Sequence, residues 1–157
     1  MNPASLYHKL NDLLGLLGGW LRSPLLLVIR LYWGWQFFLT GKGKLAHLGR
    51  TTEYFASHNL PAPKLNAILA GSTECVFGLL LLAGLGGRVV PLPLIGLLTV
   101  AYATTEQEAL HSIFSNPDKF VTADPFLFLL AAVVILVFGP GKLSLDALLG
   151  KKTSSGD

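Results

Sequence analysis

Two ionisable residues of opposite charge, Arg30 and Glu74, each lie inside a long apolar stretch of the sequence. A charged side chain at membrane depth costs at least a few kcal/mol, so such residues normally face the interior of a helix bundle and pair. With a rise of about 1.5 Å per helical residue, Arg30 is expected roughly 8 Å, and Glu74 about 16 Å, below the same surface. An extended arginine spans that offset. The sequence therefore predicts a buried Arg30–Glu74 pair.

Small residues share the helical face of each charge. Gly71 and Gly78 lie on the face of Glu74, and the face of Arg30 carries residues at spacings of four and three, namely Gly34, Phe37, Gly41 and Lys44. Glycines beside a charge allow two membrane helices to approach closely. Two interpretations of the pair stay open: a site for protons or a ligand, or a structural staple that fixes helix register.

Four apolar runs position these residues, and polar connections separate them. The membrane spans are expected at residues 25–41, 65–85, 89–105 and 125–138. The chain has 157 residues, of which 52% are hydrophobic and 13% are charged, whereas soluble domains contain about 25% charged residues. The predicted fold class is all-α, a polytopic membrane protein with a four-helix transmembrane bundle.

The N-terminal segment has a different pattern. Residues 1–24 carry leucines at helical spacing on one side, polar residues mainly on the other, and Trp20 near the end, which predicts an amphipathic helix in the membrane interface. Ser23-Pro24 is expected to redirect the chain into the bilayer at the start of the first span, and this span is expected to act as an uncleaved insertion signal. The predicted domains are thus an interfacial helix at 1–24, a transmembrane domain at 25–146 and a polar tail at 147–157, with disorder expected from Lys151 onward. Both termini are expected to be cytoplasmic.

Several kinds of chemistry are excluded by what the sequence lacks. Cys75 is the single cysteine, so the chain has no internal disulfide or dithiol pair. All four histidines lie outside the expected spans, which argues against buried bis-histidine haem, and no metal or nucleotide motif is present. The basic residues gather between the apolar runs, which is typical of contact with a lipid bilayer and not with nucleic acid.

The order and spacing of these motifs resemble the DoxX family of bacterial membrane proteins. The resemblance covers roughly residues 25–146 and rests on the Arg30 to Lys44 stripe, Leu60-Pro61, Glu74 to Arg88, Gly139-Pro140-Gly141 and Leu145-Asp146. It implies a four-helix bundle in the bacterial cytoplasmic (inner) membrane, and kinship with the DoxD-type subunit of thiosulfate:quinone oxidoreductases. It also implies a link to quinones or oxidative stress, with Arg30 and Glu74 as the family's intramembrane charged positions. A thiosulfate site would have to come from a partner subunit.

Three functions follow, and whether the chain is an enzyme stays open. In the first, the chain is a redox-associated membrane subunit, a possible oxidoreductase subunit, in which Arg30 orients a quinone carbonyl and Glu74 relays a proton. Trp33 or Phe37 would pack the quinone ring, and Gln36 and Tyr102 are further candidate contacts. The second is a non-enzymatic scaffold for partner proteins or lipids, with the Arg30–Glu74 pair as a staple. The third is a small-solute transporter formed by a homodimer.

Overall fold

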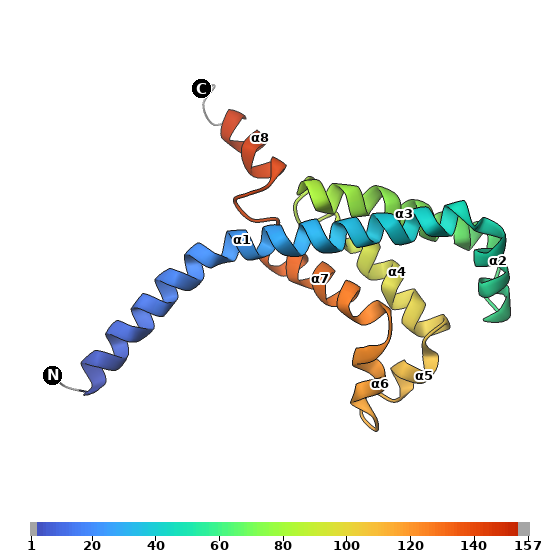
Figure 1. Cartoon of the computed structure of the whole chain (residues 1–157), viewed down its shortest axis with the longest axis horizontal. Helices are drawn as coiled ribbons and strands as arrows, with labels where there is room; N and C mark the ends of the chain where they lie inside the picture. The colour runs from blue at the N-terminus through green and yellow to red at the C-terminus, as the bar shows by residue number, and fades with distance from the viewer. Residues whose placement is uncertain (1–2, 154–157) are drawn as a thin grey trace.

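The computed structural model describes residues 3–153, and every regular element in that range is a helix, which confirms the all-α prediction. Figure 1 shows their arrangement. In chain order they are α1 (Pro3–Ala46), α2 (Leu48–Ser57), α3 (Pro63–Ala83), α4 (Pro91–Thr104), α5 (Gln107–His111), α6 (Pro117–Thr122), α7 (Pro125–Phe138) and α8 (Leu145–Thr153).

Helix α1 is one continuous helix of 44 residues, so the N-terminal helix and the first span, which were expected as two helices, are joined. Pro24 lies inside α1, which changes direction along its length (Figure 1). An internal proline removes one backbone hydrogen bond and bends a helix. Leucine-rich sequence on both sides keeps the backbone helical through that bend. Residues 4–22, here called the N-terminal arm, are exposed throughout and extend beyond the other helices (Figure 1).

Two of the described helices, α1 and α3, are long and apolar enough to cross a membrane. Helices α4 and α7 are apolar but contain 14 residues each. At 1.5 Å per residue they extend about 21 Å, less than the ~30 Å of a hydrocarbon core. Length alone therefore supports two of the four expected spans.

Close packing of α1 on α3 is the main contact of the fold. A Cβ atom placed on Gly41 would lie 2.6 Å from the carbonyl oxygen of Gly71, and one on Gly78 would lie 2.8 Å from the Cβ of Phe37. Gly34 is equally close to the backbone of Leu82. The small-residue faces predicted on both helices thus meet.

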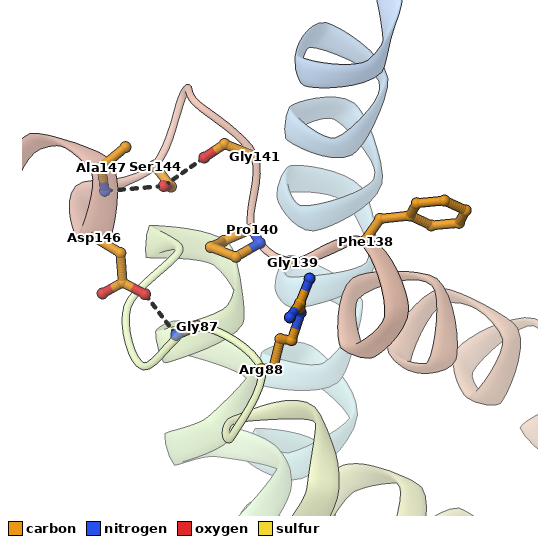
Figure 2. A pocket seen from close by; sticks show the side chains of 9 residues that line it. All are labelled: Gly87, Arg88, Phe138, Gly139, Pro140, Gly141, Ser144, Asp146 and Ala147. Atoms are coloured by element: carbon orange, nitrogen blue, oxygen red, sulfur yellow. Dashed lines mark hydrogen bonds between the residues drawn. The ribbon is translucent and has the colours of Figure 1, made fainter. Parts of the chain in front are cut away.

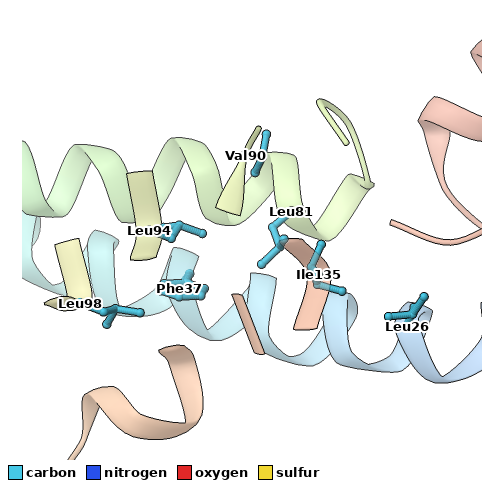
Figure 3. Packing of buried hydrophobic residues seen from close by; sticks show 7 residues of the cluster. All are labelled: Leu26, Phe37, Leu81, Val90, Leu94, Leu98 and Ile135. Carbon is cyan, nitrogen blue, oxygen red and sulfur yellow. The ribbon is translucent and has the colours of Figure 1, made fainter. Parts of the chain in front are cut away.

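A hydrophobic core joins this helix pair to α4 and α7, which pack against each other (Figure 3). Its buried members come from all four helices and from the turn before α4: Leu26, Phe37, Leu81, Val90, Leu94, Leu98 and Ile135. Most of the remaining large apolar side chains on α1, α3, α4 and α7 are exposed or half-buried, as expected of surfaces that face lipid.

Short helices occupy regions that were expected to be polar connections. Helix α2 lies within 45–64, and α5 and α6 lie within 106–124. Glu108 of α5 forms a salt bridge with Lys119 of α6, which lowers the pKa of that carboxyl group. The C-terminal tail also differs from expectation, since α8 continues to Thr153; residues 154–157 lie outside the described range.

Candidate functional site

Arg30 is almost fully enclosed, with 1% of its surface exposed. Its Nη2 atom donates a hydrogen bond of 2.5 Å to the carbonyl oxygen of Leu143, in the loop between α7 and α8. The Nε and Nη1 atoms are buried and have no hydrogen-bond partner within the described residues. The guanidinium group therefore carries donors that no described residue satisfies.

Glu74 is buried as well, but its partner is Lys44. The Nζ atom of Lys44 donates to both carboxylate oxygens of Glu74, at 2.7 and 2.6 Å. The predicted Arg30–Glu74 pair is therefore wrong. The guanidinium of Arg30 lies against Gly84, ten residues beyond Glu74 on α3, or about 15 Å along the helix.

The direction of helical side chains explains these partners. Every Cα–Cβ bond in an α-helix tilts toward the N-terminus of that helix. Since α1 and α3 are antiparallel, Arg30 points along α1 toward the end of α3, and Glu74 points along α3 toward the end of α1. The two charges diverge, and Glu74 meets Lys44 instead.

The loop that accepts the hydrogen bond of Arg30 forms part of an open pocket of about 460 Å³ (Figure 2). We call it the arginine-end pocket; it is lined by Gly87, Arg88, Phe138, Gly139, Pro140, Gly141, Ser144, Asp146 and Ala147. Asp146 holds the two walls together, because its carboxylate accepts hydrogen bonds from the backbone amides of Gly86 at 3.1 Å and Gly87 at 2.5 Å. Ser144 donates to the carbonyl oxygen of Gly141 at 2.7 Å, which fixes the turn before α8.

Arg30 lies directly behind this wall. Gly84 has a φ of +70°, and a Cβ atom there would lie 1.6 Å from Nη1 of Arg30 and 2.8 Å from the Cβ of Ser144. Only glycine fits this position, both for its backbone conformation and for the space that the guanidinium occupies. The end of α3, the loop after α7 and the start of α8 thus enclose one buried cation.

The sequence of the chain matches one known protein family. The DoxX family model matches residues 25–107, just over half of the chain. The chain belongs to the DoxX family. The match includes Arg30, Lys44, Glu74 and Arg88, whereas the loop and helix that close over Arg30, residues 139–147, lie beyond it.

A relative of this DoxX protein is a protein of Haemophilus influenzae described as an uncharacterized protein. It is 28% identical over 131 residues, which is 80% of this chain and 83% of the relative. No solved structure matches.

The predicted quinone contacts of the DoxX protein do not gather at one place. Trp33 and Phe37 both pack edge-on against Phe128, with ring centroids 4.8 Å away in each case, and Phe37 is fully buried. Tyr102 lies near the end of α4, where its hydroxyl donates to the carbonyl oxygen of Phe120 at 2.9 Å. Gln36, on α1, is half-buried. Of these four residues, the structure brings only Trp33 and Phe37 onto a common ring.

Sequence reasoning missed the partners of both buried charges. Lys44 is on the predicted helical stripe of Arg30, but it was not predicted as a partner of Glu74, although the N-terminal tilt of its side chain directs it there. The contact of Arg30 with Leu143 involves a backbone carbonyl 113 residues away, for which the sequence contains no local signal. The sequence motifs that contain Gly84, Gly139 and Asp146 lie close together in the structure, because all three residues line or flank the arginine-end pocket.

Proposed function

We propose that this DoxX protein is a multi-pass subunit of the bacterial inner membrane that binds a quinone at Arg30. Family membership and the two long apolar helices support a membrane location. Helices α4 and α7 would complete four crossings if the bilayer thins locally around them, which costs fractions of a kcal/mol per Å of mismatch. The N-terminal arm, with its leucines and Trp20 exposed, would lie in the membrane interface.

The observation that carries the proposal is the incomplete hydrogen bonding of Arg30. A guanidinium has five N–H donors, yet among residues 3–153 only Nη2 has an acceptor. Each buried donor without a partner costs about 1–3 kcal/mol, so a ligand that supplies acceptor oxygens is stabilised at this position. A quinone has two neutral carbonyl acceptors and dissolves in the bilayer, which suits a cation enclosed among apolar helices.

The arrangement also limits the roles of other residues. Glu74 is about 15 Å from the guanidinium, so in this proposal it does not transfer a proton directly to a quinone at Arg30. Its pairing with Lys44 fixes the crossing of α1 and α3 instead. Because Arg30 is covered by the loop before α8, that loop would have to move for a quinone to enter, and any substrate oxidation would require a partner subunit.

Binding of decylubiquinone to the full-length protein in nanodiscs tests the proposal. Arg30→Gln should weaken binding about tenfold or more, because it removes a charge-assisted donor worth at least about 1.5 kcal/mol. Arg30→Lys should restore part of it, since lysine keeps the charge but loses the planar fork. Arg50→Gln is the matched control, being exposed on α2 at the opposite end of α1. Equal affinity in the Arg30→Gln and Arg50→Gln proteins, or no binding by the wild type, would refute the proposal.

A non-enzymatic scaffold is the second candidate, and the Lys44–Glu74 pair favours it. Both oxygens of Glu74 are bonded to Lys44, so this buried charge is satisfied within the protein and acts as a staple between α1 and α3. In a scaffold the exposed N-terminal arm would contact lipids or a partner subunit. Normal physiological function in a cell that carries a quinone-binding-deficient Arg30 variant would favour this alternative.

A further inference from the structure

The two ends of the helix pair differ in charge. One end holds the turn after α3, the start of α4 and the end of α7; here called the arginine end, it carries Arg22, Arg30, Arg88, Lys142 and Asp146. The N-terminal arm and α8 lie beyond this end, and α2 lies at the other (Figure 1). The opposite end and its connections contain cations and carboxylates in similar numbers: Lys42, Lys44, Arg50, Lys64 and Lys119 against Glu53, Glu74, Glu106, Glu108, Asp118 and Asp124.

The single described carboxylate of the arginine end is already engaged. The carboxylate of Asp146 accepts hydrogen bonds from the backbone amides of Gly86 and Gly87. Arg88 and Lys142 are exposed and form no salt bridge with any residue in 3–153. The arginine end therefore has excess positive charge that no described side chain neutralises.

Arg88 directs this excess charge into the arginine-end pocket. Its side chain runs along the pocket toward Gly139 and Pro140 (Figure 2), and its Nε lies 3.7 Å from where a Cβ of Gly139 would be. Arg22 lies against Phe138 at the edge of the same pocket. Its Nη2 donates a hydrogen bond to the carbonyl oxygen of Phe138 at 2.8 Å, and its guanidinium lies over the Phe138 ring, 5.4 Å from the centroid. A planar guanidinium beside an open pocket is the geometry that binds phosphate through two parallel hydrogen bonds.

We propose that the arginine-end pocket binds the phosphate of an anionic membrane phospholipid, with Arg88 as its main ligand and Arg22 and Lys142 as flanking cations. The pocket lies where the apolar helices α3 and α7 end, which is the level of lipid headgroups in a bilayer. The exposed ring of Phe138 continues from the pocket onto the apolar surface of α7, where an acyl chain would pack. This site is separate from the quinone site, because it uses exposed cations and an anionic ligand.

Native mass spectrometry of the full-length protein tests this inference, with phosphatidylglycerol and, as the zwitterionic reference, phosphatidylethanolamine. Retention of phosphatidylglycerol should exceed that of phosphatidylethanolamine, and Arg88→Gln should reduce it about tenfold. Arg50→Gln is again the matched control, since it removes the same exposed charge at the opposite end. Arg88 forms no hydrogen bond within the described residues, so its replacement leaves the fold intact. Equal lipid retention in the Arg88→Gln and Arg50→Gln proteins would overturn the inference.

Inorganic phosphate distinguishes a lipid site from a general anion site. The acyl chains of a lipid add apolar contacts that free phosphate lacks, so millimolar phosphate should leave bound phosphatidylglycerol in place. Displacement of the lipid by millimolar phosphate would overturn the assignment to a lipid. Failure of the quinone proposal shows itself in the Arg30 variants, and the comparison of Arg88→Gln with Arg50→Gln is independent of that result.

Discussion

Replacement of Gly41 by alanine probes the contact on which the fold depends most. The added Cβ would lie 2.6 Å from the Gly71 carbonyl oxygen, 2.7 Å from the Cys75 amide nitrogen and 2.8 Å from the Cβ of Glu74. Two of these three atoms belong to the backbone of α3, so no rotamer change relieves the clash. The helices must separate instead.

The size of the effect follows from these distances. Ordinary contact begins at 3.4 Å, so the oxygen of Gly71 must retreat by about 0.8 Å, the difference between 3.4 and 2.6 Å. Forced overpacking of this kind costs about 1–3 kcal/mol. Gly43 provides a control two residues away on the same helix, because a Cβ there meets nothing within 4 Å. Both substitutions share the gain of about 0.5–1 kcal/mol from replacing a helical glycine.

The difference between the two variants therefore isolates the contact between α1 and α3. We expect Gly43→Ala to unfold at or above the wild-type midpoint when SDS is titrated into mixed micelles. Gly41→Ala should be less stable than Gly43→Ala by about 1–3 kcal/mol. If both variants have the same free energy of unfolding, α1 and α3 do not cross at Gly41, and the packing described above is incorrect.

Two further predictions concern the charged contacts. Lys44→Met should cost about 3 kcal/mol in the same unfolding assay, because it strands the buried carboxylate of Glu74. Glu74→Leu should cost less, since the Lys44 that it leaves is 29% exposed, and the double variant should be close to wild type; a Lys44→Met variant as stable as the double would contradict the pairing. Asp146→Ala removes the carboxylate that accepts hydrogen bonds from the amides of Gly86 and Gly87, so hydrogen exchange of these amides should become at least about tenfold faster. Unchanged exchange rates would show that Asp146 does not attach α8 to this turn.

Hydrophobic runs and glycine spacing were sufficient to predict the four apolar helical segments and the contact of α1 with α3, but not the short helices α2, α5 and α6. The last apolar run coincides with α7 at Pro125–Phe138, and the glycines expected to face each other on α1 and α3 do so. The continuity of α1 through Pro24 was not predictable in the same way, because proline both bends and ends helices and local sequence does not decide between these outcomes.

The partners of the buried charges required information that depth arithmetic leaves out. The estimated depths of Arg30 and Glu74 in the membrane differ by less than the length of an arginine side chain, which predicted a contact. The tilt of helical side chains instead directs the two charges toward opposite ends of the antiparallel helix pair. The direction of helical side chains can be derived from the sequence once α1 and α3 are assumed to be antiparallel, so the contact of Lys44 with Glu74 was predictable. The hydrogen bond from Arg30 to Leu143 was not, since it depends on where a loop more than a hundred residues away folds back.

The loop that covers Arg30 lies outside the segment that the family model matches. The matched DoxX segment, residues 25–107, supplies the buried cation and the glycine turn against which it lies. Residues 139–147 supply the carbonyl acceptor, the carboxylate of Asp146 and most of the pocket wall, and they lie outside that segment. Arg30 therefore contacts Gly84 within the matched segment and is covered by residues 139–147 outside it, so its position does not depend on the covering loop alone. Substitutions in residues 139–147 should therefore change how Arg30 is covered, and leave the packing of α1 on α3 unchanged.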